Sequence, residues 1–257
     1  MTVNHRVAGS NPARGAKKII MEEIVTKTPH QPVGWLEVKL ASLEVERLHS
    51  YIGYAEKNPI DRNSTLAGNI SKSLDLIDDD NWFFHTVLVP LIEEYQTQFP
   101  EYARRVGILT EDAPFCMNSF WVNFQKENEF NPIHNHSGVF SFAIWIKIPT
   151  NWREQHKIPI SANSNSPGAS NFEFSYTDML GAITQNTFLL DNAAEGRMLF
   201  FPSGLMHNVY PFYNCSETRI SISGNISFDI SENIMKQYRA QNRKSAFNGA
   251  TYSNNRD

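Results

Sequence analysis

Cysteine is scarce in this sequence of 257 residues, and several other features that mark common classes of protein are absent. Cys116 and Cys215 are too few for a disulfide framework, and no CxxC pair indicates a zinc ribbon or a redox motif. No apolar run reaches the roughly 18 residues that a membrane helix needs, and the N-terminus lacks the apolar core of a signal peptide. We therefore expect two reduced thiols in a cytoplasmic protein with no membrane partner.

A strong net charge is absent as well. The formal charge is −4, so no global positive field would hold a nucleic-acid backbone. Lysine and arginine do gather near the N-terminus and between Lys236 and Lys244, and these two basic segments leave nucleic acid open as a partner. No residue pattern indicates an oligomeric state.

Changes in composition divide the chain into three parts. Residues 1–31 have no periodic apolar pattern and predict a mobile basic arm. Residues 32–230 are long enough for one domain with a substantial core, and we expect a helical part over 32–110 and a core of strands over 115–230. Over residues 231–257 the apolar pattern thins into a C-terminal extension that we expect to be partly flexible.

Helical spacing of apolar residues is found mainly in the first half of the domain. One amphipathic helix is expected to begin near Ser42, after an extended segment over 33–40, and a second to run from Asp80 to about Phe99. Pro90 lies in the middle of the second segment. Because proline lacks the N–H that a helix interior needs, we expect this helix to kink at Pro90 or to begin there.

The second half of the domain has the two-residue alternation of β-strands. The alternation is clearest in two interleaved sets: Phe120, Val122 and Phe124, and Trp121, Asn123 and Gln125. Further strands are expected over 138–148, 172–178, 183–190, 196–202 and 218–228. The polar segment 160–171 predicts a loop between two strands, for which a lid is one interpretation. Helices followed by many strands indicate the α+β class with an all-β core.

Three histidines are candidates for a metal site. His134 and His136 are two residues apart, at or just ahead of a predicted strand, and side chains at this spacing leave a strand on the same face. His207 follows a predicted strand and a Pro-Ser-Gly turn. If a jelly roll brings these strand ends together, the three imidazoles cap one face of an iron ion. A surface histidine pair without a metal is the alternative.

Arg219 and Ser221 share a predicted strand face after the distal histidine. A guanidinium that binds a carboxylate through two hydrogen bonds, with a hydroxyl as a further donor, suits a buried dicarboxylate tail. The alternative is an edge-strand arginine that pairs with a surface acid such as Glu217.

These motifs together resemble the 2-oxoglutarate- and iron(II)-dependent oxygenases found in bacteria and bacteriophages. The segments that carry the resemblance are WVNFQKENEFNPIHNHSGVFSFAIWI, GRMLFFPSGLMHNVYPF and ETRISISGNISF, within residues 115–230. The resemblance implies a double-stranded β-helix core, also called a jelly-roll or cupin-like core, with N-terminal helices packed on it. It also implies Fe(II) and 2-oxoglutarate as cofactors.

By this resemblance, His134 and His207 bind the metal, and Arg219 with Ser221 holds the distal carboxylate of 2-oxoglutarate. Most of the superfamily has Asp or Glu where this sequence has His136. We expect three histidine ligands, because a neutral imidazole is a competent ligand for iron.

The departure at this third position leaves two alternatives. A water molecule takes the place of the third ligand, or a carboxylate arrives from Asp178 or Asp191, neither of which stands at a family position.

The resemblance further implies hydroxylation of a C–H bond of a peptidyl or small-molecule substrate by dioxygen, with release of succinate and carbon dioxide. Asn123 is a further candidate for binding the co-substrate, because an amide near an iron site can hydrogen-bond a keto acid. The candidates for the substrate pocket are Asn131, Phe140, Phe142, Trp145 and Asn225. Core packing explains the aromatic residues equally well, and turn formation before Pro132 explains Asn131.

Two other functions fit part of the pattern. A three-histidine cupin dioxygenase that needs no keto acid explains the histidines but not Arg219 and Ser221. A non-catalytic jelly-roll binding module with a vestigial metal site explains the missing carboxylate. Oxygen uptake that depends on 2-oxoglutarate would separate the oxygenase from the first, and release of succinate would separate it from the second.

Overall fold

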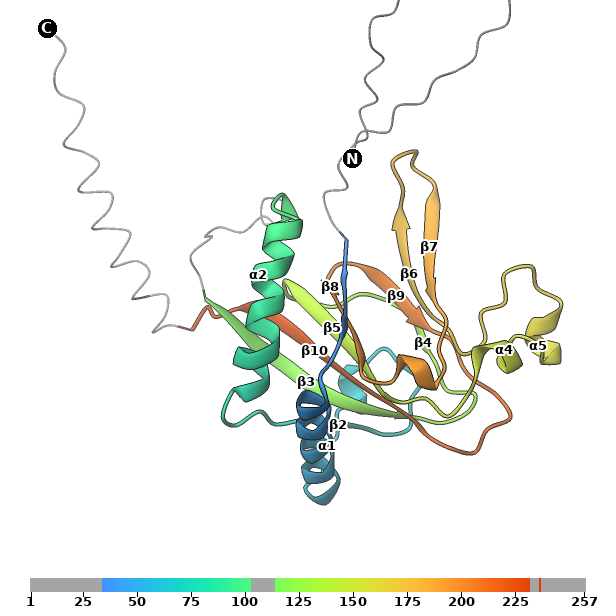
Figure 1. Ribbon diagram of the computed structural model, residues 1–257, viewed down its shortest axis with the longest axis horizontal. Coiled ribbons are helices and arrows are strands. Elements are labelled where there is room, and N and C mark those ends of the chain that lie inside the picture. The colour runs from blue at the N-terminus through green and yellow to red at the C-terminus, as the bar shows by residue number, and fades with distance from the viewer. Residues whose placement is uncertain (1–33, 103–113, 232–235, 237–257) are drawn as a thin grey trace, which may run out of the picture. The chain divides into compact units, whose positions relative to one another are not determined.

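Helices and two antiparallel β-sheets make up the described part of the chain, which comprises residues 34–102, 114–231 and 236 of a computed structural model (Figure 1). The predicted order of helices first and strands afterwards is confirmed. The predicted mobile arm and nearly all of the predicted C-terminal extension lie outside the described residues. Within those residues, no helix combines the length and the apolar character needed to span a membrane.

The larger sheet has six strands in the order β1-β8-β5-β10-β3-β2, and each neighbouring pair is antiparallel. The strands are β1 (Leu36–Lys39), β2 (Ser73–Asp75), β3 (Phe115–Gln125), β5 (Phe140–Lys147), β8 (Arg197–Pro202) and β10 (Arg219–Phe228). The strands predicted over 138–148, 196–202 and 218–228 are confirmed. β2 has no predicted counterpart, because so short a strand cannot show an alternation.

The smaller sheet has four strands in the order β4-β9-β6-β7. They are β4 (Asn131–His134), β6 (Phe172–Thr177), β7 (Ile183–Phe188) and β9 (Met206–Val209). The strands predicted over 172–178 and 183–190 are confirmed and form a hairpin. β4 and β9 pair so that His134 and His207 are direct cross-strand partners.

Two helical segments precede the main run of strands. α1 (Ser42–Lys57) begins where it is predicted, and the second segment runs from η2 (Phe84–Leu88) into α2 (Val89–Gln98). η2 is a π-helical turn in which the N–H of Val89 donates to the carbonyl of Phe84. Pro90 lies in the first turn of α2, directly after this wider turn. α2 thus begins at Val89, next to Pro90, as one of the two predicted alternatives has it, but it continues the helical turn before it without a break.

Alternation along the central strands gives the larger sheet two apolar faces. On β8, Met198 and Phe200 join the core formed with α1 and α2, whereas Leu199 and Phe201 join a second core formed with the smaller sheet. Burying each such side chain contributes about 1.5–3 kcal/mol. The larger sheet is thus covered by helices on one face and by the smaller sheet on the other.

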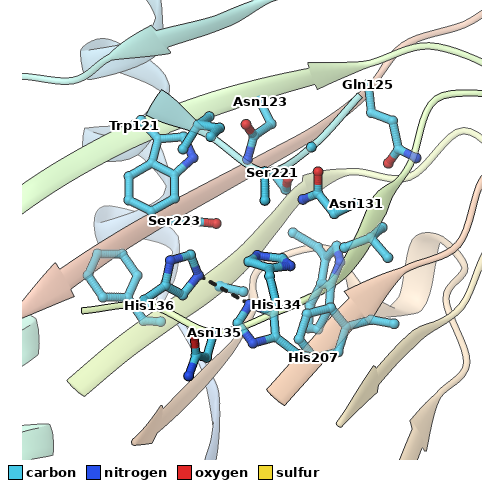
Figure 2. Close-up of a pocket in the computed structure, with 18 of the residues that line it drawn as sticks. Trp121, Asn123, Gln125, Asn131, His134, Asn135, His136, His207, Ser221 and Ser223 are labelled. Carbon is cyan, nitrogen blue, oxygen red and sulfur yellow. Dashed lines mark hydrogen bonds between the residues drawn. The ribbon is translucent and has the colours of Figure 1, made fainter. Parts of the chain in front are cut away.

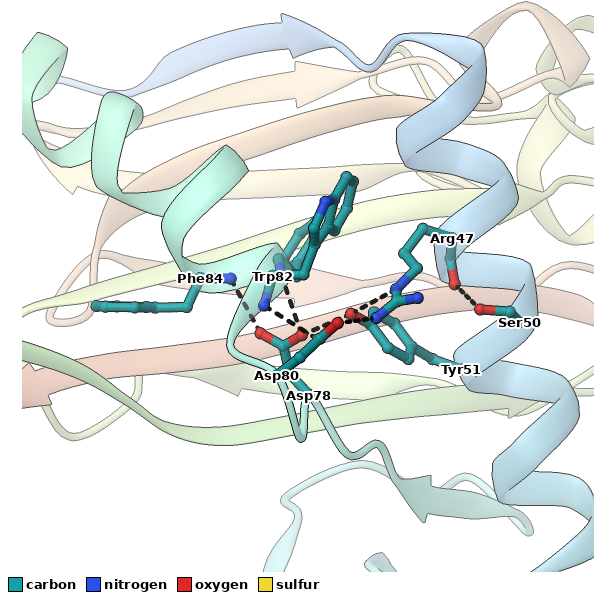
Figure 3. A network of polar contacts seen from close by, with 8 residues as sticks. Arg47, Ser50, Tyr51, Asp78, Asp80, Trp82 and Phe84 are labelled. Carbon is teal, nitrogen blue, oxygen red and sulfur yellow. Dashed lines mark hydrogen bonds and ion pairs between the residues drawn. The ribbon is translucent and has the colours of Figure 1, made fainter.

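A carboxylate joins the two helical segments (Figure 3). One oxygen of Asp78 accepts from the hydroxyl of Tyr51 at 2.5 Å, and the other accepts from the N–H of Phe84 at 3.0 Å. Arg47 donates to the same hydroxyl at 3.0 Å and pairs with Asp80 at 2.5 Å. Because the first N–H groups of a helix lack partners within it, Asp78 stabilises the start of the second helical segment.

Short helical turns occupy several connections: η1 (Asn63–Thr65), α4 (Trp152–Gln155), α5 (Pro159–Ala162) and η3 (Asn192–Ala194). α5 falls at the start of the segment predicted as the loop 160–171. Residues 169–171, at the end of that segment, are buried. This end is a fixed part of the fold and not a lid.

Candidate active site

A cavity of about 170 Å³ lies between the two sheets. It is lined from the larger sheet by β3, β5, β8 and β10, from the smaller sheet by β4, β6 and β9, and at one side by residues 65–68. Trp121, Asn123 and Gln125 all line it, because alternate residues of β3 leave the strand on the same face. Figure 2 shows these three side chains on one side of the cavity and the histidines on the other.

His134 and His207 are held by their own chain segments. The Nδ1–H of His134 donates to the carbonyl of Pro132 at 2.7 Å, and that of His207 donates to the carbonyl of Leu205 at 2.9 Å. A hydrogen bond at Nδ1 selects the tautomer whose lone pair is on Nε2. Both Nε2 atoms are therefore prepared to bind a metal.

His136 reaches the same place by a different route. It does not share a strand face with His134, because β4 ends at His134 and the turn 135–139 follows. The N–H of His136 donates to the carbonyl of Ser203 at 2.9 Å. Gly138 has a φ of 107°, and a Cβ there would lie 2.7 Å from the carbonyl oxygen of Ile226. Only glycine fits this turn without strain, and the turn directs His136 toward the other two rings.

The three rings converge on one point. The ring centroids are 5.1 Å apart for His134 and His136, 4.3 Å for His134 and His207, and 4.9 Å for His136 and His207. The Nε2 atoms of His136 and His207 are 3.1 Å apart, and one nitrogen of each ring lies within 4.8 Å of the others. Nitrogen ligands at about 2.1 Å and at right angles around one metal lie roughly 3 Å apart. This group could hold a metal ion.

Burial keeps these imidazoles neutral. Together with a smaller effect of the nearby histidines, it lowers the pKa of His136 to about 4 and that of His207 to about 3. Burial also lowers the pKa of His134. A metal binds the neutral form of imidazole, so the three side chains are ready to bind at neutral pH without losing a proton.

Neither aspartate considered as a ligand belongs to this group. Asp178 accepts from the N–H groups of Leu180 and Ala182 in the turn between β6 and β7. Asp191 accepts from the N–H of Ala193 at 3.0 Å and lies 3.7 Å from Arg153. Among the described residues, the potential ligands at this point are histidines alone.

Arg219 lies deep in the same cavity and is only 1% exposed. Its Nη2 donates to the carbonyl of Ser170 at 3.2 Å, to the hydroxyl of Ser170 and to the hydroxyl of Thr150 at 3.4 Å. Its Nη1 lies 3.5 Å from Oε1 of Gln125, and its Nε has no partner. The guanidinium also lies 4.9 Å from the ring centre of Phe212.

All of these partners are uncharged, so no described carboxylate neutralises Arg219. Glu217, the surface acid considered as an alternative partner, pairs with Lys147 at 2.8 Å instead. Burial lowers the pKa of Arg219 to about 9, so the side chain stays a cation at neutral pH. A buried cation with a free donor is suited to binding an anionic ligand.

The other predicted residues fall into two groups. Asn123, Asn131, Trp145 and Ser221 line the cavity, and so does Phe142, whose ring also packs against Phe83 and Phe120 in the helical core. The oxygen of the Asn123 amide accepts from Ser73 at 2.8 Å, whereas that of the Asn131 amide is buried without a partner.

Two predicted pocket residues lie elsewhere. Asn225 lies two residues further along β10 than Ser223, opposite Ser141 of β5, and its Oδ1 accepts from the hydroxyl of Ser141 at 2.8 Å. Phe140 packs with Tyr95 and Phe200 in the helical core. Neither side chain lines the cavity.

Several residues that line the cavity or contact Arg219 have no predicted counterpart. Trp121 has its ring centre 5.7 Å from that of His136, and residues 65–68 close one wall. Ser170 and Thr150 surround Arg219 from segments 49 and 69 residues away in the sequence. The alternation of β3 indicates the face of Trp121, but no local pattern indicates the other contacts.

Residues 119–225 match the family model described as "Putative 2OG-Fe(II) oxygenase". The match includes the three histidines, Arg219 and Ser221. This segment of the chain therefore resembles a 2OG-Fe(II) oxygenase domain. The predicted resemblance is confirmed, and with it the prediction that the protein is an enzyme with Fe(II) and 2-oxoglutarate as cofactors.

Three of the solved structures that are similar to this chain are as follows. A prolyl-4-hydroxylase from Pseudomonas putida is 12% identical over 76% of this chain and 93% of its own, with a TM-score of 0.45. A prolyl hydroxylase from Trichoplax adhaerens, in complex with a hypoxia inducible factor peptide fragment, is 12% identical over 76% and 83%, with a TM-score of 0.46. HygX from Streptomyces hygroscopicus, with nickel and 2-oxoglutarate bound, is 10% identical over 77% and 84%, with a TM-score of 0.42.

No protein with a curated record matches the sequence significantly. The family assignment of the oxygenase domain therefore rests on the match to residues 119–225. The donors in the cavity suit the family's cofactors, since neutral imidazoles bind Fe(II) and an unneutralised buried guanidinium binds a carboxylate.

Proposed function

We propose that this oxygenase hydroxylates a C–H bond of a peptidyl or small-molecule substrate, with His134, His136 and His207 as the metal ligands and Arg219 as the anchor of 2-oxoglutarate. The observation that carries the proposal is that three neutral imidazoles and one unneutralised guanidinium line a single cavity. One ligand that chelates a metal at one end and carries a carboxylate at the other suits both groups at once.

In this proposal, His134, His136 and His207 would hold Fe(II) through one ring nitrogen each. When bound, Fe(II) would couple the reduction of dioxygen to the oxidative decarboxylation of 2-oxoglutarate, which yields succinate and carbon dioxide. The backbone acceptors of His134 and His207 fix the orientation of these rings, and the turn 135–139 fixes that of His136. Ligands fixed in advance need no reorganisation when the metal binds.

Arg219 has the task of binding the distal carboxylate, for which its Nε–H and its weakly held Nη1 are available. Ser221 and Asn123 are cross-strand partners and line the same cavity. The oxygen of the Asn123 amide already accepts from Ser73, so its Nδ2 is the atom that is left to donate to the co-substrate.

The substrate site proposed here is the part of the cavity near Trp121, Asn131 and Trp145. The buried oxygen of Asn131 has no partner, which suits an N–H or O–H donor of a substrate. Trp121 and Trp145, each 3% exposed, give this region two aromatic walls.

The fold that goes with this function is the double-stranded β-helix. Its support is a pair of facing antiparallel sheets whose strands bring the ends of β4, β9 and β10 to one cavity.

Succinate release tests the proposal. With Fe(II), ascorbate, dioxygen and 2-oxoglutarate, wild-type protein is expected to form succinate, and candidate peptides and metabolites that stimulate the reaction identify the substrate class. His207→Ala and Arg219→Ala are expected to reduce the rate to background, whereas the surface variant Lys157→Ala keeps it. Robust turnover by either cavity variant would remove the proposal.

A three-histidine dioxygenase without a keto acid is the second candidate. It is favoured by the absence of any carboxylate from the described potential ligands. Oxygen uptake with a thiol or diketone and no 2-oxoglutarate would support it. The buried Arg219 has no role in that reaction, so Arg219→Ala would leave such uptake intact.

A further inference from the structure

Ser170 has an unusual backbone for its residue type. Its φ is 70°, in the left-handed region that favours glycine, and its side chain is completely buried. Its N–H donates to the carbonyl of Pro211 at 2.8 Å, and its carbonyl accepts from Arg219. A serine at such a position indicates that its side chain has a purpose there, because glycine would adopt this backbone without strain.

That purpose is visible in its contacts. The hydroxyl of Ser170 accepts from Nη2 of Arg219 and lies 3.0 Å from the hydroxyl of Thr150. The carbonyl of Ser170 accepts from the same nitrogen at 3.2 Å. A left-handed residue can direct its carbonyl and its side chain to one donor, and here both meet Nη2.

We propose that Ser170 is a positioning residue for the co-substrate, which holds Nη2 of Arg219 so that Nε and Nη1 remain available to the distal carboxylate of 2-oxoglutarate. This inference rests on the proposed role of Arg219 as anchor. Thr150 supports Ser170 through the hydroxyl contact, and its own contact with Nη2 is longer, at 3.4 Å.

The neutrality of these acceptors matters for the proposed role. Arg219 needs a partner to fix its side chain, but an aspartate or glutamate would cancel the charge that attracts the co-substrate. A hydroxyl and a peptide carbonyl fix the guanidinium and leave its charge uncancelled. The positioning role therefore predicts that both loss of the hydroxyl and gain of a carboxylate at position 170 impair recognition of the distal carboxylate.

Binding of two keto acids separates this role from a merely structural one. 2-Oxopentanoate has the same chain as 2-oxoglutarate but ends in a methyl group, so it can chelate the metal without needing Arg219. Isothermal titration calorimetry with Mn(II)-loaded protein, without turnover, gives the dissociation constant of each. The dissociation constant of 2-oxopentanoate divided by that of 2-oxoglutarate measures recognition of the distal carboxylate, and this ratio falls when that recognition is impaired.

Ser170→Gly removes the hydroxyl and fits the left-handed backbone, and Ser170→Asp adds a charge. We expect the ratio to fall about tenfold in Ser170→Gly, which corresponds to one hydrogen bond to a charged group. It should fall further in Ser170→Asp and less in Thr150→Val, while the affinity for 2-oxopentanoate stays constant. Ser161→Ala is the matched control and should leave the ratio unchanged, because the buried hydroxyl of Ser161 has no partner.

Two results would overturn the proposal. An unchanged ratio in Ser170→Gly, or equal weakening of both keto acids, would show that Ser170 does not act through Arg219. Arg219→Ala tests the assumption beneath it: if that variant keeps the wild-type ratio, the proposed anchor itself fails. If Arg219→Ala loses the ratio and Ser170→Gly does not, only the inference about Ser170 is wrong.

Discussion

The two ends of the cavity are built in opposite ways. At the histidine end, two of the rings are held by backbone carbonyls two residues away in the sequence. At the arginine end, Arg219 is held by side chains and backbone 49, 69 and 94 residues away. Local contacts thus orient most of the proposed metal site, whereas the proposed anchor depends on the assembled fold. Changes at the two ends should therefore have separable effects.

Arg219→Ala should have the largest effect. Removing one partner of a buried charge interaction costs on the order of 2–5 kcal/mol in binding, so Mn(II)-dependent binding of 2-oxoglutarate should weaken by roughly 30-fold to several thousand-fold, toward the affinity for 2-oxopentanoate. Calorimetry of the variant measures this loss. Mn(II) affinity should change little, and a matching loss of metal binding would show that the two ends are not separable. Arg219→Lys keeps the charge but not the two-donor geometry and should give an intermediate affinity.

His207→Ala should mainly reduce metal affinity. Loss of a hydrogen-bond partner of a metal ligand typically lowers metal affinity roughly 10–100-fold. His207 is itself a proposed ligand and the most buried of the three histidines, so its removal should lower the affinity for Mn(II) by more than that. Equilibrium dialysis against Mn(II) measures it. His136→Asp should retain the metal, because a carboxylate replaces the lost ligand, whereas His136→Ala should not. Equal Mn(II) affinities for His136→Asp and His136→Ala would contradict a ligand role for His136.

The pH dependence of stability should sharpen the comparison further. Burial lowers the pKa of His136 from 6.5 to about 4 and that of His207 to about 3. Below pH 6.5 the unfolded chain takes up protons that the folded, metal-free protein does not, so the free energy of unfolding should fall as the pH drops from 6.5 toward 4. Urea unfolding at a series of pH values measures this slope.

A histidine variant tests whether this slope of the free energy of unfolding against pH comes from the cavity. His136→Gln should make it shallower, whereas the same change at the exposed His49 should leave it as it is. An unchanged slope in His136→Gln would contradict the account of a neutral, buried imidazole.

Tyr51→Phe should have the smallest effect, because it lies away from both ends. Burial and the hydrogen bond to Asp78 raise the pKa of Tyr51 to about 12, so its hydroxyl is protonated and donates to that carboxylate. Losing this bond should lower the free energy of unfolding by about 1 kcal/mol. Tyr54→Phe, at an exposed position, should change it less. Altered binding of 2-oxoglutarate in Tyr51→Phe would show that the helical core is coupled to the cavity.

The same contrast between local and distant contacts explains how much the sequence predicts. Periodicity predicts α1, the second helical segment and the long strands, because these follow from the spacing of neighbours. The histidines and Arg219 are also found from spacing and residue type. By contrast, β2 is too short for an alternation, and the contacts of Ser170 with Arg219 join segments with no common pattern.

His136 shows the limit of arguments from spacing. The two-residue interval from His134 indicates a shared strand face, yet the strand ends at His134 and a turn made possible by Gly138 brings the rings together. The residues converge as the spacing indicates, but through different geometry. Asn225 shows a second limit, since alternation predicts its face correctly but not that it lies further along β10 than the cavity, where it pairs with Ser141.

The most direct test of the account is a crystal structure with Mn(II) and N-oxalylglycine, an unreactive analogue of 2-oxoglutarate. The account predicts one metal bound by His134, His136 and His207, with the distal carboxylate of the analogue on Arg219. A metal bound elsewhere, or an analogue whose distal carboxylate leaves Arg219 without contact, would contradict it.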